Sequence, residues 1–215
     1  MKRFVLALPL ALFLVACKFW LPTSAPNPDP NHTHADFAVW VNGQMLNFSD
    51  ARYMSGSSKD EPAGEHDDAH HKHASLHLHD GNGHVIHRHK PGLGIGEFFA
   101  SLDITMTKDC LTLDDFQYGK LDAGWKADFA ITKNLCNNGK FHWTMVVNGT
   151  EKPMDPHYVF ADDDKILLTY SAGDSWEEEW KQMTDDACLF SQTCPRRGKP
   201  PAENCIADPA VPCTE

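Results

Sequence analysis

The sequence predicts an α+β fold: a small mixed sheet of β-hairpins packed on a short helix, with a disulfide-rich C-terminal tail. Short runs of β-forming residues flank glycine-containing turns and predict the sheet. One apolar stripe at helical spacing predicts the helix. Four cysteines after residue 187 predict the tail.

The first predicted hairpin joins residues 37–41 to residues 44–48. Asn42 and Gly43 lie between them, and both tolerate the positive φ of a type I′ turn. Pairing residue 41 with residue 44 places four apolar side chains on one face, which we expect to be core. They are Phe37, Val39, Leu46 and Phe48.

A second hairpin is predicted to join residues 75–79 to residues 85–89. A three-residue loop over residues 81–83, with Gly83 in the left-handed conformation, makes His77 face His87. A loop of two or four residues would place the histidines of the two strands on opposite faces. The predicted register therefore decides whether these histidines can meet.

Later elements follow from the same signals. Residues 95–102 form an apolar stripe at i, i+3, i+4 and i+7, which predicts a short helix. Residues 141–147 and 166–170 are rich in β formers, with turns at residues 148–149 and 162–164. Ser175 and Glu178 predict a capping box for a late helix that carries two tryptophans.

The order of these elements, a hairpin, a helix and two further strands, is similar to that of a ubiquitin-like β-grasp domain. The last strand is entered through an acidic turn, and the second hairpin would be an insertion. The resemblance rests on the order of elements alone and implies a mixed sheet covered by one helix.

The N-terminus has the features of a secretory signal. Lys2 and Arg3 precede an apolar run over residues 4–15, which is too short for a permanent membrane-spanning helix. The string Leu14-Val15-Ala16-Cys17 resembles the lipobox of bacterial lipoproteins. The resemblance implies a signal peptide over residues 1–16 and a lipidated Cys17, so that the protein is anchored to a bacterial membrane in the cell envelope, facing the periplasm or the exterior. An ordinary signal peptide or an uncleaved anchor is the alternative.

Composition divides the rest of the chain. Residues 17–31 contain four prolines and predict an extended tether. Residues 32–183 form the predicted His-rich α+β domain, within which residues 55–74 have almost no apolar side chain and predict a mobile insert. Residues 184–215 form the Cys-rich tail.

Charge favours a cation as the ligand. The net charge is −11, and removing Lys2 and Arg3 leaves 17 basic against 30 acidic side chains, a net charge of −13. A chain this acidic without a basic cluster excludes nucleic acid as a partner and makes direct binding to anionic lipid unfavourable. The expected partners are therefore a metal ion and, through the lipid anchor, a membrane; an envelope protein partner stays open.

The cysteine count favours disulfides. Six cysteines remain beside Cys17, an even number in an exported chain. The wide gap before residue 188 favours pairing the first two with each other and keeping the other four together. The candidates are Cys110, Cys136, Cys188, Cys194, Cys205 and Cys213.

Histidines carry the chemistry. The chain has 13, and three His-x-His pairs occur on strand-like segments. Residues two apart on a strand point to the same face at about 6.6 to 7 Å, so both imidazoles can bend toward one ion at about 2.0 to 2.1 Å. The expected metal ligands are His77, His79, His87 and His89, with His32 and His34 completing this site or forming a second one. Neutral imidazoles suit Zn(II), Cu(II), Ni(II) or Co(II), and affinity alone favours copper; Zn or Cu is the expected cofactor.

The remaining histidines are weaker candidates for metal ligands. Weak metal capture is expected of the histidines in the insert, which are His66, His70, His71 and His73. His142 and His157 are expected at the surface. A solvated histidine tract and incidental strand histidines remain the alternatives to metal binding.

The leading interpretation is a lipid-anchored extracytoplasmic protein that binds Zn or Cu for capture, buffering or delivery. A metal-dependent enzyme, of the hydrolase or cupin type, could use the same histidines with Asp36 or Asp80 as a general base beside metal-bound water. The glutamate that cupins place after their His-x-His is missing, and the chain is too short for a (β/α) barrel. No catalytic residue is therefore assigned. A pH-sensitive interaction module is the third interpretation.

A second resemblance covers most of the mature chain. Residues 32–37, 186–188 and 194–201, together with Cys205, resemble an uncharacterised group of secreted and lipid-anchored bacterial proteins. The resemblance implies no established activity.

Overall fold

The computed structural model describes residues 27, 32–55, 73, 75–124, 132–173 and 175–194. The predicted signal peptide, Cys17 and nearly all of the tether lie outside these residues, as do most of the insert, Cys205 and Cys213. Within the described part of the chain, no helix is both long and apolar enough to span a membrane.

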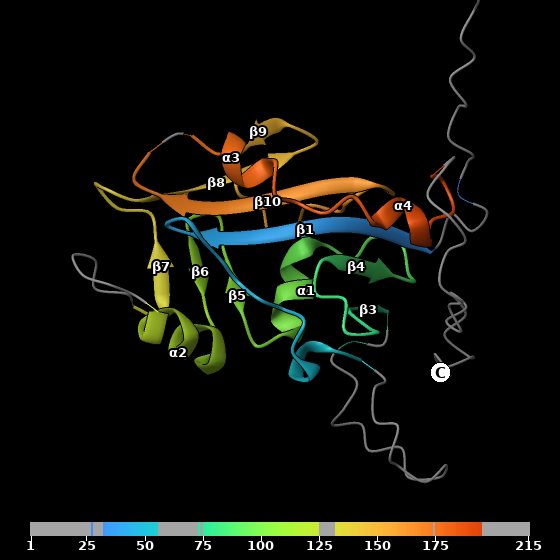
Figure 1. Ribbon diagram of the computed structural model, residues 1–215, viewed down its shortest axis with the longest axis horizontal. Coiled ribbons are helices and arrows are strands. Elements are labelled where there is room, and N and C mark those ends of the chain that lie inside the picture. Colours follow the sequence, from blue (N-terminus) through green and yellow to red (C-terminus); the bar gives the residue numbers. More distant parts are fainter. Residues whose placement is uncertain are drawn as a thin grey trace, which may run out of the picture.

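The α+β class is confirmed. Seven strands form a mixed sheet in the order β3-β4-β1-β10-β8-β9, and β2 pairs with β1 off this path. The long strands β1 (Thr33–Val41) and β10 (Asp164–Ser171) lie parallel at the centre, and β8 (His142–Val147) runs antiparallel to β10 (Figure 1). The resemblance to a β-grasp domain stays a resemblance in the order of elements.

The first hairpin forms as predicted. Val41 pairs with Gln44, the first residue of β2 (Gln44–Met45), and the turn residues Asn42 and Gly43 have φ of 46° and 81°. The four apolar side chains expected on one face are all buried in the main core. Alternation along β1 therefore places its odd-numbered residues in the core and its even-numbered residues on the opposite face.

The second hairpin has the predicted register but shorter strands. β3 (Leu76–His77) pairs with β4 (Val85–Arg88) so that His77 faces His87. The expectation for Gly83 is wrong, because the positive φ values in the loop belong to Asp80 and Gly81. Gly83 instead lies against the chain after β2, where an added Cβ would come within 2.3 Å of the carbonyl carbon of Phe48.

The predicted helix is α1 (Ile95–Ser101), and it covers the core face of the sheet. Ile95, Phe98 and Phe99 are fully buried, and the Phe98 ring meets the Phe37 ring edge-on at 5.0 Å between centroids. The backbone N–H of Gly94 donates to the Glu97 carboxylate at 2.7 Å, which ties the start of the helix.

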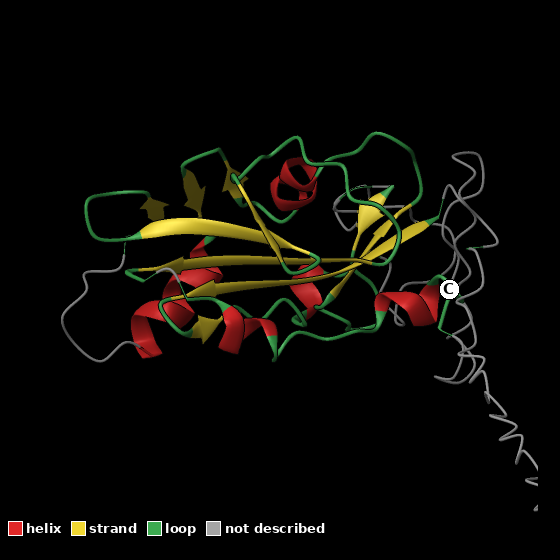
Figure 2. Ribbon diagram, turned by 90° about the horizontal axis from the view of Figure 1, so that it is seen from above, coloured by secondary structure: helices red, strands yellow, loops and turns green. Residues whose placement is uncertain are grey.

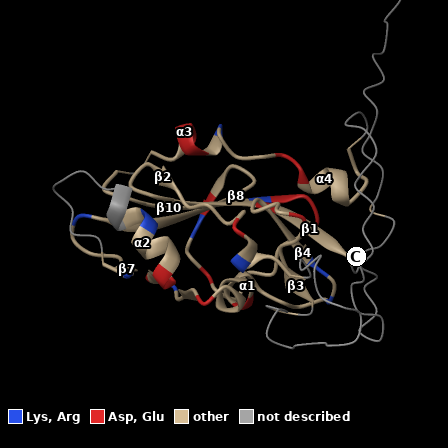
Figure 3. Ribbon diagram, turned by 60° about the horizontal axis from the view of Figure 1, so that its bottom comes forward, with Lys and Arg blue, Asp and Glu red and all other residues tan. Residues whose placement is uncertain are grey.

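On the other face lies a smaller apolar cluster under α3 (Glu177–Trp180), whose outer surface is acidic (Figure 3). The predicted capping box is wrong. The helix begins one residue later than expected, with Trp176 as the N-cap, and the Ser175 hydroxyl donates to the Glu177 carboxylate. Glu178 instead pairs with Lys181.

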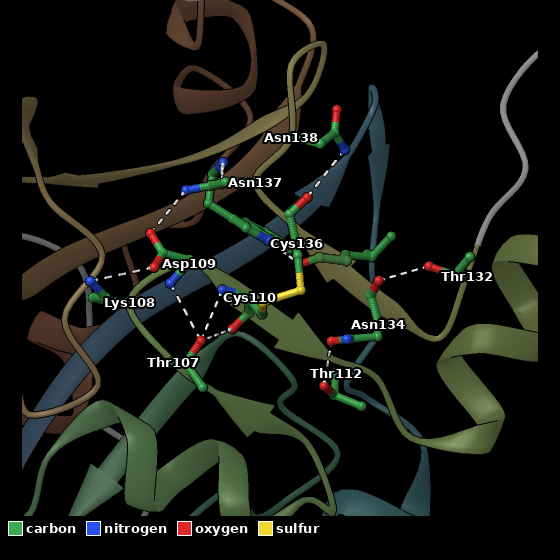
Figure 4. The surroundings of a disulfide bond; sticks show 12 residues. Thr107, Lys108, Asp109, Cys110, Thr112, Thr132, Asn134, Cys136, Asn137 and Asn138 are labelled. Carbon is green, nitrogen blue, oxygen red and sulfur yellow. Dashed lines mark hydrogen bonds and ion pairs between the residues drawn. A yellow bond between two sulfur atoms is a disulfide. The ribbon is translucent and has the colours of Figure 1, made fainter.

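Several elements carried no clear sequence signal. They are the 3₁₀ turn η1 (Ala51–Tyr53), helix α2 (Asp115–Gly124), strand β9 (Thr150–Lys152) and a second sheet of β5 (Thr105–Met106), β6 (Cys110–Thr112) and β7 (Asn134–Cys136). Their strands have only two or three residues, too few to show alternation. The predicted disulfide between Cys110 and Cys136 joins β6 to β7 (Figure 4).

The beginning of the predicted tail is part of the folded domain. Residues 187–190 form the short helix α4 (Ala187–Phe190), which lies at the end of the sheet where β1 begins (Figures 1 and 2). A second disulfide joins Cys188 to Cys194, as expected from pairing within the last four cysteines.

Candidate metal centre

Six histidines gather on one face of three neighbouring strands. The register pairs His34 of β1 with His87 of β4, and His87 with His77 of β3. Because Thr33 pairs with Arg88, the same antiparallel register brings His32 beside His89. This histidine cluster lies on the face opposite the α1 core. Its members are His32, His34, His77, His79, His87 and His89.

Three members of the cluster could hold a metal ion. One ligand nitrogen each from His32, His34 and His87 lies within 4.8 Å of the others, and all three residues are buried. Nitrogens bound tetrahedrally at about 2.0 to 2.1 Å are about 3.3 Å apart. Small rotations of the rings are therefore enough to bring all three onto one ion.

The remaining members surround this triad. His89 stacks near His32, with 4.0 Å between ring centroids, and His77 lies 4.9 Å from His89. His79 approaches from the edge strand, and its Nε2 lies 3.0 Å from Nδ1 of His87. The structure thus joins the hairpin histidines and the β1 histidines in one cluster. Of the four hairpin ligands expected from the sequence, His87 belongs to the triad.

Hydrogen-bond partners decide which ring nitrogen of His34 is the ligand atom. Nδ1 of His34 lies 2.7 Å from the hydroxyl of Ser191, which itself donates its single proton to Asp162 at 2.5 Å. The hydroxyl must therefore accept a hydrogen bond from the N–H at Nδ1 of His34. Nε2 is left with the lone pair, and this atom is buried. A carboxylate that orients a metal-binding histidine in this way is typical of metal sites.

Hydrogen-bond partners also indicate the tautomers of the hairpin histidines. The Nδ1 atom of His77 lies 3.0 Å from the carbonyl oxygen of His73, which can only accept. The Asp80 carboxylate accepts a hydrogen bond from Nδ1 of His79 at 2.9 Å. Nε2 of His79 then accepts from Nδ1 of His87, which leaves Nε2 of His87 as the ligand atom. His34 and His87, two members of the triad, thus present Nε2 as the coordinating nitrogen.

Burial keeps His77 uncharged. The pKa of His77 is lowered from 6.5 to about 4, mainly because burial disfavours the charged ring, with a further lowering from neighbouring histidines. Asp80 and Asp162 approach the rings, the latter 3.9 Å from Nδ1 of His34. Neutral imidazoles are the form that binds transition metals.

The candidate general bases are already engaged. Asp36 lies on the same face as His34 but accepts hydrogen bonds from Thr184, Asp186 and Ala187, and burial raises its pKa in spite of them. Asp80 is bonded to His79. Both carboxylates therefore already accept hydrogen bonds from groups of the protein.

Sequence reasoning missed the residues that cover the cluster. The ring of Phe190 lies edge-on to His87 at 4.8 Å, and Ser191 orients His34. His34 and Ser191 are 157 positions apart. A contact between positions this distant leaves no local pattern in the sequence.

The other histidines considered in the sequence analysis lie away from the cluster or outside the described residues. Among the expected weak ligands, only His73 belongs to the described residues, and its carbonyl group supports His77. His66, His70 and His71 lie outside them. His157 is exposed in a loop, and His142 is half-buried at the start of β8.

Comparison with known proteins returned no family model, no curated protein sequence and no solved structure that matches this chain.

Proposed function

We propose that the chain is a lipid-anchored protein of the cell envelope that binds a transition metal, Zn or Cu, for capture, buffering or delivery. The observation that carries the proposal is the convergence of five buried histidines and the half-buried His79 on one face of the sheet, from β1, β3, β4 and the residues next to these strands. Burying so many polar rings is unfavourable unless their nitrogens gain partners, and apolar side chains would fill the same space at lower cost. One metal ion would bind several of these nitrogens at once.

The ligand set that we propose is His32, His34 and His87, completed by His89. These residues are the two His-x-His pairs of β1 and β4, which the antiparallel register places directly opposite each other. His79 would then orient His87 by a hydrogen bond and would not itself bind the ion. Four neutral nitrogen ligands suit Zn(II) and Cu(II).

Binding is favoured over catalysis because the cluster is covered. Phe190 lies on three of its rings, and both nearby carboxylates that could have served as bases make other hydrogen bonds. A closed site of imidazoles holds an ion, whereas a catalytic metal keeps one coordination position open.

Calorimetric titration of the mature chain with Zn(II) and with Cu(II) tests the metal site. We expect one tight equivalent in the parent and its loss in His32→Ala/His34→Ala. The matched control, His157→Ala, removes an exposed imidazole outside the cluster and should bind as the parent does. The proposal fails if the parent binds no stoichiometric metal, or if the double substitution leaves the affinity unchanged.

Deleting residues 56–72 separates the cluster from the insert. The histidines of the cluster lie on or next to strands that are already paired, so the deletion should remove only weak additional equivalents. If the deletion abolishes all binding and the cluster substitution abolishes none, the insert is the functional element.

The envelope location has its own test. The string before Cys17 supports lipidation, and the two disulfides are those expected of an exported chain. In a bacterial host, Cys17→Ser should move the protein from the membrane fraction to the soluble fraction. Unchanged partition, together with a mature N-terminus that carries no acyl mass, would contradict the lipid anchor.

A further inference from the structure

One short segment covers the histidine cluster and is fixed to the sheet at both of its ends. At its start, Asp36 of β1 accepts hydrogen bonds from the Thr184 hydroxyl at 2.6 Å and from the Ala187 backbone at 3.0 Å. At its end, the Thr193 hydroxyl donates to Asp163 at 2.5 Å. Figures 1 and 2 show α4, which lies within this segment, beside the beginning of β1.

Between these ends, two consecutive side chains contact the cluster. The Phe190 ring lies 4.8 Å from the His87 ring and 5.6 Å from the His34 ring, between centroids. The Ser191 hydroxyl accepts a hydrogen bond from Nδ1 of His34 and donates one to Asp162. Phe190 shields the rings from water, and Ser191 fixes the ligand nitrogen of His34.

The Cys188–Cys194 disulfide closes the loop that carries both side chains. Within the loop, the backbone N–H groups of Thr193 and Cys194 donate to the carbonyl oxygen of Cys188. Gln192 has a φ of 57°, a left-handed conformation that a side chain disfavours. A covalent closure restricts the chain to such a conformation, because it removes the alternatives that an open loop would sample.

We propose that the Cys188–Cys194 disulfide is a redox modification site that controls the metal affinity of the histidine cluster; the inference rests on the proposed function. A dithiol reductant supplies two electrons and two protons. Its thiolate attacks one sulfur, the S–S bond breaks through a mixed disulfide, and both cysteines become thiols while the reductant becomes a disulfide. Both cysteines are partly exposed, so a reductant can reach them.

Reduction opens the loop, and Phe190 and Ser191 lose their fixed positions. Water then reaches the rings, and His34 is no longer held with Nε2 as its ligand atom. Loss of such an outer-shell contact weakens metal binding by about 10- to 100-fold. Oxidised protein therefore retains the ion, and reduced protein releases it.

Zinc affinity, measured by competition with a chromophoric chelator, tests the inference. Relative to the parent, Cys188→Ser/Cys194→Ser should bind Zn(II) at least about tenfold more weakly. The matched control, Cys110→Ser/Cys136→Ser, removes the disulfide between β6 and β7 and should keep the affinity of the parent. Serine is used because free thiols would themselves bind zinc.

Ser191→Ala, with the disulfide intact, separates positioning from mere folding. The imidazole ¹⁵N spectrum of the metal-free protein should show His34 losing its Nδ1–H tautomer, a change that general loosening elsewhere would not produce. An unchanged His34 tautomer in this variant contradicts the assigned role of Ser191.

Binding of Zn(II) by Cys188→Ser/Cys194→Ser within twofold of the parent overturns the redox inference while leaving the metal site intact. If the parent itself binds no zinc, it is the proposed function that fails. Should the double variant not fold, zinc release from the folded Cys110→Ser/Cys136→Ser protein is followed after adding a phosphine reductant. Faster release supports the inference, and an unchanged rate refutes it.

Discussion

Replacing the titratable ring of His77 should make the free energy of unfolding of the metal-free protein depend less on pH below neutrality. Burial lowers the pKa of His77 from 6.5 to about 4, so the unfolded chain binds a proton between these pH values while the folded protein does not. Stability therefore decreases as the pH falls from 6.5 to 4, and His77 contributes nothing further below that range.

The size of the effect follows from the shift. Each pH unit between the two pKa values is worth about 1.4 kcal/mol, so His77 accounts for a loss of roughly 3 kcal/mol in the free energy of unfolding. His77→Gln keeps a polar side chain but cannot take up the proton. Its stability should fall by roughly 3 kcal/mol less than that of the parent between pH 7.5 and pH 4.

Urea unfolding followed by tryptophan fluorescence, with a chelator present, measures both profiles. Only the change with pH is compared, so any constant effect of the substitution cancels. His157→Gln, in an exposed loop, is the matched control and should leave the difference between the two pH values as in the parent. Equal losses in the parent and in His77→Gln would refute a buried, neutral His77.

Three further variants test contacts that stabilise the folded protein. Asp36→Ala removes the acceptor that fixes the start of the covering segment. Hydrogen exchange should show faster opening of residues 184–194, and the free energy of unfolding should fall by about 2–3 kcal/mol. Unchanged exchange would contradict the contact. Cys110→Ser/Cys136→Ser opens a link across 26 positions and should cost about 2–4 kcal/mol in chemical denaturation, whereas an unchanged midpoint would show that the link adds no stability. Gly83→Ala brings a Cβ within 2.3 Å of the Phe48 backbone and should lower stability by about 1–3 kcal/mol; an unchanged melting temperature would argue against this close approach.

The sequence by itself determined those features that depend on neighbouring residues. Asn42 and Gly43 fixed the first turn because few other residue pairs tolerate two positive φ values, and the side-chain alternation around them then fixed which face is core. The helical stripe of α1 is local in the same way, whereas the pairing of Cys110 with Cys136 followed from the wide gap that separates them from the other four cysteines. The register that sets His77 opposite His87 is the predicted one, although the left-handed residues of the loop are Asp80 and Gly81 rather than Gly83.

Local signals failed where short elements depend on tertiary support. The strands β5, β6 and β7 have two or three residues each, and the packed core stabilises them rather than their own alternation. The capping box failed because α3 begins one residue later than its Ser-x-x-Glu string indicates. Residue preference at a cap is worth about 1 kcal/mol, which packing readily exceeds.

Only the tertiary structure decided how the histidines combine. The sequence shows three His-x-His pairs, but the pairing of β1 with β4 is what sets His34 opposite His87 and makes one cluster instead of two sites. The same holds for the cover, since Phe190 and Ser191 reach the cluster from more than 100 positions away along the chain. Ligand type and spacing along a strand are local properties, whereas convergence on one ion requires strands to pair over long distances. That pairing is set by the burial of the whole sheet, to which no short stretch of sequence corresponds.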